Sequence, residues 1–87
     1  MSKFYYVYVL RSHKDGNFYV GATGDLPLRV QQHEAGEVRS TAHRRPLELI
    51  YYEACRSQHD AFKREKYLKT AWGKRYLKTR LASYLTG

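Results

Sequence analysis

Cysteine, proline and long apolar runs are all scarce in this 87-residue chain. The single Cys55 excludes an internal disulfide framework, and one cysteine among four histidines gives no recognisable zinc spacing. A reducing, cytoplasmic setting is therefore expected. No apolar run of roughly 18 residues predicts a membrane helix, and the first residues show no signal-peptide pattern. The length predicts one domain over residues 1–87.

Acidic residues are also few. Sixteen Lys and Arg stand against eight Asp and Glu, which gives a net charge of +8. Eight of the sixteen cations fall within residues 63–80, where Glu65 is the only acid. This concentration favours a polyanionic partner, and nucleic acid in particular, over the alternatives of a solvated helical face or a ribosome-associated or membrane-surface protein.

Aromatic residues, by contrast, are abundant, and two of the nine tyrosines stand in paired strand patterns. Residues 4–10 are rich in Tyr and Val and predict a strand with Tyr8 on one face and valines on the other. The turn at Asp15 leads into a second strand over residues 18–22. An antiparallel hairpin of these strands brings Tyr8 and Tyr19 into one neighbourhood.

Capping signals predict three helices. The first covers about residues 26–35, after the N-cap Asp25 and before a stop glycine. The second covers about residues 58–71 and begins after Ser57, which stands three residues before an Asp as in a capping box. A glycine then separates it from a last helix over about residues 74–85.

A third strand is predicted over about residues 47–53. Its one-residue alternation is blurred, as happens when both faces are covered, so a central position in the sheet is expected. The predicted fold is therefore a small α/β (α+β) domain. Its three-stranded, mainly antiparallel sheet is flanked by helices.

Arg29 and His33 lie one turn apart on the first predicted helix. His33 shares a stripe with Leu26 and Val30, and Arg29 lies beside it, so both face inward or at its margin. An ordinary surface pair is the alternative. Basic residues that could contact a phosphate backbone follow in the loop of residues 37–46 and in the later helices: Arg39, His43, Arg44, Arg45, Lys63, Lys66, Lys69, Lys74 and Arg75.

Glu65 stands out because it falls inside the apolar stripe formed by Ala61, Leu68 and Trp72. Burying an ionised carboxylate is costly unless it is paired or bound to a metal. Two explanations remain open, a structural ion pair with a cation such as Arg29 and a divalent-metal ligand at the edge of the core.

Together these positions resemble the GIY-YIG nuclease domain. The resemblance covers nearly the whole chain, and is strongest with small stand-alone members. It extends to the N-terminal incision domain of bacterial nucleotide-excision repair and to homing endonucleases, which points to DNA repair. The first motif keeps Tyr8 but has Tyr6 and Val7 in place of Gly and Ile. The second motif keeps Tyr19 and Gly21, with Val20 for Ile. Some members of the family also use an Asn late in the domain. The only Asn of this chain is Asn17, in the predicted turn, so no such role is assigned.

The resemblance implies a metal-dependent endonuclease that hydrolyses DNA, with structure rather than sequence deciding the substrate. Glu65 would hold one Mg²⁺ or Mn²⁺, and Arg29 would bind the scissile phosphate. Tyr8 and Tyr19 would orient and activate the attacking water, with Tyr8 preferred as base and His33 as competing acceptor.

The alternative function is a nucleic-acid-binding module that keeps the fold without turnover or that needs a protein partner for specificity. DNA is the expected partner, with RNA left open, and no membrane is expected.

Overall fold

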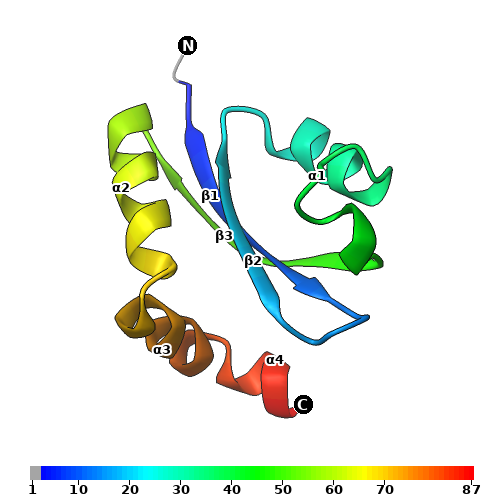
Figure 1. The fold of residues 1–87 in the computed structure, drawn as a ribbon. Coiled ribbons are helices and arrows are strands. Elements are labelled where there is room, and N and C mark those ends of the chain that lie inside the picture. The colour runs from blue at the N-terminus through cyan, green and yellow to red at the C-terminus, as the bar shows by residue number, and fades with distance from the viewer. Residues whose placement is uncertain (1–2) are drawn as a thin grey trace.

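Strand β1 (Tyr5–Ser12) forms the centre of the sheet (Figure 1). It pairs antiparallel with β2 (Phe18–Thr23) on one side and with β3 (Leu47–Cys55) on the other. These elements come from a computed structural model, in which residues 3–87 are described. The predicted three-stranded antiparallel sheet is confirmed. The central position expected for the third strand is wrong, because the sheet order is β2-β1-β3 and β3 forms an edge.

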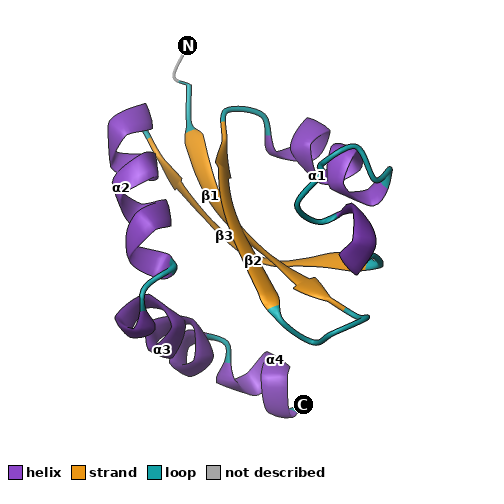
Figure 2. Ribbon diagram, viewed as in Figure 1, coloured by secondary structure: helices purple, strands orange, loops and turns teal. Residues whose placement is uncertain are grey.

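The two faces of the sheet carry different cores. Valines of β1 and β2 pack with residues of α2 (Gln58–Leu68) and α3 (Ala71–Arg80), and the opposite face buries Tyr8 against α1 (Leu26–Glu34). Figure 2 shows the sheet between these helices. Since alternate residues of a strand point to opposite faces, the alternation predicted for β1 is confirmed. The first core contains Val7, Val9, Val20, Ala61, Leu68 and Leu77.

Two helices begin where their caps predict. The Asp25 side chain accepts a hydrogen bond from the backbone N–H of Leu28 at 3.2 Å, and Ser57 accepts one from Asp60 at 3.3 Å. Each bond satisfies an amide that the first helical turn leaves without a partner. These caps fix the first residues of α1 and α2, which carry the candidate site residues Arg29 and Glu65.

The junction between α2 and α3 differs from the prediction. Helix α2 ends at Leu68, and Thr70 caps α3 by accepting a hydrogen bond from the Gly73 N–H at 3.2 Å. Gly73 therefore lies in the first turn of α3 instead of stopping a helix. The break also shifts the helical phase, so Trp72 does not continue the apolar stripe and is 67% exposed. The last helix predicted over residues 74–85 is divided between α3 and α4 (Ala82–Thr86).

The segment between α1 and β3 folds back beneath α1. It contains one short 3₁₀ turn, η1 (Ala42–Arg44), and it buries the side chain of Thr41 completely. This loop thereby places the hydroxyl of Thr41 against α1. None of the helices within residues 3–87 has the length and apolar character needed to cross a membrane.

Candidate active site

Three buried side chains form a hydrogen-bonded line through the interior. The Tyr8 hydroxyl of β1 lies 2.8 Å from Nε2 of His33 on α1, and Nδ1 of His33 lies 2.8 Å from Oγ1 of Thr41. All three residues are at most 1% exposed. Because buried polar groups are costly unless they are paired, this line satisfies both ring nitrogens of His33.

The surroundings of Thr41 determine the direction of these bonds. Its hydroxyl has the carbonyl of Val38 as an acceptor at 3.5 Å, which leaves the hydroxyl oxygen free to accept. We therefore assign the proton of neutral His33 to Nδ1, which donates to Thr41. Nε2 then accepts the hydrogen bond that Tyr8 donates. The Tyr8 oxygen keeps its lone pairs for another donor.

Tyr19 and Gly21 of β2 surround the same phenol. The ring centroids of Tyr19 lie 6.4 Å from Tyr8 and 5.2 Å from His33, so the three rings form one cluster. A Cβ added to Gly21 would lie 2.5 Å from the Tyr8 hydroxyl oxygen, so the glycine leaves the space that the phenol occupies. Tyr19 is only partly buried and Tyr8 is buried, so Tyr19 is the phenol closer to solvent.

Arg29 brings a positive charge to this cluster. Burial raises the pKa of Tyr8 above its ordinary value of 10.0, and the Arg29 guanidinium beside the phenol opposes the rise without cancelling it. Burial lowers the pKa of His33 to about 4, and the charge of Arg29 adds to that shift. Tyr8 is therefore protonated and His33 neutral at neutral pH.

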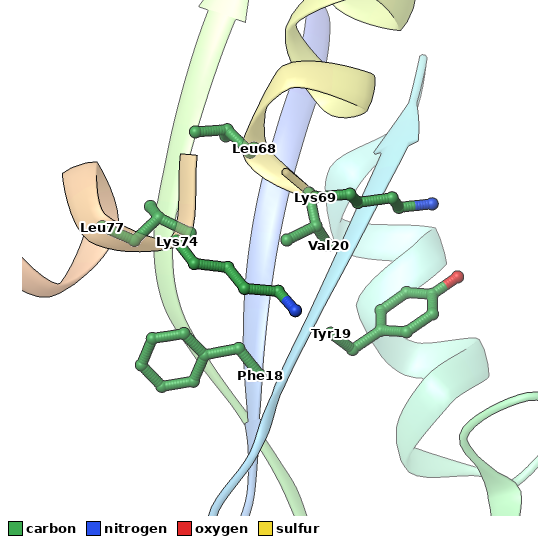
Figure 3. Close-up of a pocket in the computed structure, with 7 residues that line it drawn as sticks. All are labelled: Phe18, Tyr19, Val20, Leu68, Lys69, Lys74 and Leu77. Atoms are coloured by element: carbon green, nitrogen blue, oxygen red, sulfur yellow. The ribbon is translucent and has the colours of Figure 1, made fainter. Parts of the chain in front are cut away.

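Glu65 belongs to α2, which covers the face of the sheet opposite to Tyr8 and His33. Its carboxylate lies 3.3 Å from Nζ of Lys69, one turn further along α2, and its side chain is 21% exposed. Its negative charge adds to the rise in the pKa of Tyr8. Figure 3 shows the Lys69 ammonium and the Tyr19 hydroxyl on the same side of β2. The ion pair that the sequence suggested with Arg29 is thus replaced by one with Lys69.

Comparison with known proteins identifies the family. The model of the GIY-YIG catalytic domain matches residues 4–85. The chain belongs to the GIY-YIG family. It is 44% identical over 69 residues to a UPF0213 protein of Lacticaseibacillus paracasei, which covers 78% of this chain and 76% of that protein. A UPF0213 protein of Bacillus pumilus is 39% identical over 67 residues, which are 76% of this chain and 67% of that protein.

A solved structure supports the same assignment. The solution NMR structure of a UPF0213 protein from Bacillus halodurans is 32% identical, with a TM-score of 0.54. The alignment covers 87% of this chain and 83% of that chain. The resemblance inferred from the motifs is therefore confirmed, and the family is one of nucleases. The names of these relatives state no activity.

The basic residues of this GIY-YIG domain divide into two groups. Two of them serve the fold: Arg44 Nε lies 3.0 Å from a carboxylate oxygen of Asp15, and Arg45 donates to the carbonyls of Ala42 and Glu34. The others that the sequence suggested for nucleic-acid contact are exposed: Arg39, His43, Lys63, Lys66, Lys69, Lys74 and Arg75. The Arg75 guanidinium lies 5.0 Å from the centre of the Trp72 ring.

Thr41 is the site residue that the sequence does not reveal. It stands in a loop without periodicity, and its contact with His33 depends on how that loop folds back under α1. The pairing of Glu65 with Lys69, by contrast, had a signal in the sequence. A Glu four residues before a Lys on one helix is a favourable spacing for an ion pair.

Proposed function

We propose that this chain is a metal-dependent endonuclease that hydrolyses DNA phosphodiester bonds and selects its substrate by structure. The observation that carries the proposal is the line from the Tyr8 hydroxyl through His33 to Thr41, with Arg29 beside the phenol. This line fixes the position of the Tyr8 phenol oxygen and provides Nε2 of His33 as an acceptor for its proton. Binding of nucleic acid alone requires neither.

Arg29 binds the scissile phosphate in this proposal. Its planar guanidinium presents several N–H donors in a fixed fork, which matches phosphate oxygens better than an ammonium does. Its charge also stabilises the extra negative charge that develops on the phosphoryl oxygens during attack. Tyr19, the phenol closer to solvent, orients the attacking water.

Proton transfer runs through Tyr8. The attacking water gives one proton to the Tyr8 oxygen while the phenol passes its own proton to Nε2 of His33, so the phenol stays neutral. Nε2 of His33 is free to accept because the imidazole is neutral at neutral pH, and the other ring proton stays on Nδ1, where it is donated to Thr41. The buried imidazolium is unfavourable, so it returns the proton through Tyr8 to solvent, and the departing oxygen takes its proton from a water molecule. His33 thus acts through Tyr8 and is a positioning residue.

The metal proposed for the site is Mg²⁺ or Mn²⁺, held by Glu65. Within residues 3–87 no three His, Cys, Asp or Glu side chains are grouped to enclose an ion. Mg²⁺ does not need such a cage, because it keeps several waters and binds proteins through one or two carboxylates. The partly exposed Glu65 carboxylate fits that requirement once Lys69 moves aside. When bound, the metal supplies charge that stabilises the phosphoryl and leaving oxygens.

A cleavage assay tests the proposal. The purified protein is incubated with single-stranded, flap and duplex DNA in the presence of Mg²⁺ or Mn²⁺. We expect cutting that is lost in Glu65→Gln and in Arg29→Ala, while both variants still bind DNA. Glu37→Gln is the matched control, since it removes the same charge from an exposed loop and is expected to cut at the wild-type rate.

Two outcomes would contradict the proposal. Unchanged cutting by Glu65→Gln would remove Glu65 from the site and point to a contaminating nuclease. Salt-sensitive binding with no cutting of any substrate would favour the alternative, a nucleic-acid-binding module.

A further inference from the structure

We propose that a groove between the β1–β2 hairpin and helices α3 and α4 holds an unpaired DNA strand that leads away from the candidate site. The proposal rests on the proposed function only for the direction of the strand and deepens it by naming the substrate class. Two adjoining hollows define the groove. They have volumes of about 230 Å³ and about 880 Å³, and both are lined by Phe18 and Lys74.

The first hollow adjoins the candidate site at Tyr19 and otherwise lies on the face of the sheet that packs against α2 and α3. Tyr19 forms part of its wall, and Leu68 and Leu77 are also among its lining residues. Figure 3 shows the Lys74 ammonium close to β2, with Phe18 and Tyr19 extending to opposite sides of the strand, and Lys69 also lines this hollow. An anionic strand that passes Tyr19 therefore meets a cation at the entrance to the groove.

The second hollow continues this path along α3. Lys78, one turn after Lys74 on the same helix, lines it together with residues of α4 and of the β1–β2 turn. Within residues 3–87, neither of these lysines has a carboxylate within ion-pair distance. Arg44 also lines this hollow, but Asp15 neutralises it. Lys69 lines the first hollow but pairs with Glu65, so Lys74 and Lys78 are the lysines of the groove that have no carboxylate partner within residues 3–87.

The composition of the groove favours an unpaired strand over a duplex. A duplex offers phosphates on its outside and keeps its bases stacked within, so its bases cannot stack on an aromatic side chain of the groove. An unpaired strand offers both phosphates and base faces, which suit the ammonium groups of Lys74 and Lys78 beside the ring of Phe18. Sequence preference is expected to be small, because stacking and phosphate contacts accept every base.

A binding assay without catalysis tests this. Fluorescence anisotropy in EDTA measures the affinity of a labelled oligothymidine and of a duplex of equal length. We expect Lys74→Ala/Lys78→Ala to weaken single-strand binding roughly tenfold. Each phosphate contact contributes about 0.7 to the slope of log affinity against log salt for single strands, so two lost contacts reduce the slope by about 1.4.

The matched comparison is Lys63→Ala/Lys66→Ala, which removes the same charge from the exposed surface of α2, outside both hollows. We expect a smaller loss of affinity from it. An equal or larger loss would overturn the groove, and so would tighter binding of the duplex than of the oligothymidine.

The two proposals fail separately. If the Lys74→Ala/Lys78→Ala variant loses binding as expected but the wild type cuts nothing, the groove stands and the endonuclease does not. If the wild type cuts while the variant binds and cuts normally, the endonuclease stands and the groove does not.

Discussion

At the scale of single residues, the candidate site depends on Gly21, whose lack of a side chain leaves room for the phenol of Tyr8. Gly21 lies directly across from Tyr8 in the β1–β2 pairing, and the phenol occupies the space where a Cβ would be. In the family motif this glycine follows Tyr19 by two positions, so both point to the same face of the sheet. The motif therefore supplies one phenol, that of Tyr19, and through Gly21 leaves the space that the second phenol, that of Tyr8, occupies.

Replacing Gly21 by Ala tests this dependence. The new methyl would lie 2.5 Å from the Tyr8 hydroxyl, so we expect the ring to move, the bond to His33 to break and cutting to be lost. Overpacking of this kind costs roughly 1–3 kcal/mol in the free energy of unfolding, which urea titration measures. Gly24→Ala is the control, because its nearest contact, at 3.2 Å, is the flexible end of Lys3. A Gly21→Ala variant that cuts normally would contradict the assigned role of Tyr8.

The sequence could propose Tyr8, Tyr19, Arg29, His33 and Glu65 as site residues because each stands in a regular element or a short motif. Periodicity then determines which face each side chain occupies. Thr41 could not be found this way, since a loop has no period and the partner of His33 depends on tertiary folding. The sequence left the partner of Glu65 open between a cation such as Arg29 and a metal, and the structure pairs it with Lys69 one turn further along α2.

At the scale of elements, the junction of α2 and α3 decides where the exposed lysines point. Thr70 ends one helix and caps the next, so α3 takes a new direction and directs Lys74 toward β2 (Figure 3). The sequence contained the cap signal, a Thr three residues before Gly73. A helical pattern on both sides of a short break conceals it, because capping fixes a helix start only when the preceding residues are not already helical.

Replacing Gly73 by Ala tests how tightly the two helices meet. A Cβ at this position would lie 2.2 Å from the Tyr67 carbonyl oxygen and 2.4 Å from Cα of Leu68. Alanine favours a helix by roughly 1 kcal/mol over glycine, but here the backbone of α2 cannot move aside without separating the helices. We expect a net loss of roughly 2 kcal/mol in the free energy of unfolding, measured by urea titration.

Thr79→Ala on the exposed side of α3 is the control, and we expect it to leave stability within about 0.5 kcal/mol of the wild type. If Gly73→Ala proved as stable as Thr79→Ala, the close contact between the helices would be refuted.

At the scale of the whole molecule, His33 makes the stability of the fold depend on pH. Its pKa is about 4 in the folded protein and 6.5 ordinarily, so the unfolded chain binds a proton first as the pH falls. Stability is therefore fully present above about pH 6.5 and is lost as the pH falls toward 4. A difference of this size corresponds to roughly 3 kcal/mol.

Urea titrations between pH 7 and pH 4 measure this dependence. The wild type is expected to lose stability over that range, and His33→Gln to lose much less. Carboxylates with lowered pKa values, such as Glu48 and Glu53, titrate at the acidic end in both proteins, so the difference between the two curves isolates His33. His59→Gln, on the exposed surface of α2, should follow the wild type. Parallel curves for wild type and His33→Gln would mean that His33 is not held neutral by the fold.

The central position of β1 determines which parts of the candidate site lose their structure first when the fold opens locally. Tyr8 lies on the strand that is hydrogen-bonded on both sides, whereas Tyr19 lies on an edge. Amides of a central strand exchange with solvent only when the whole domain opens, while those of edges and loops exchange through local fluctuations. The amide of Tyr8 should thus be among the slowest to exchange. Local opening of β2 or of the Thr41 loop would therefore displace the residues that contact the Tyr8 phenol long before Tyr8 itself becomes exposed to solvent.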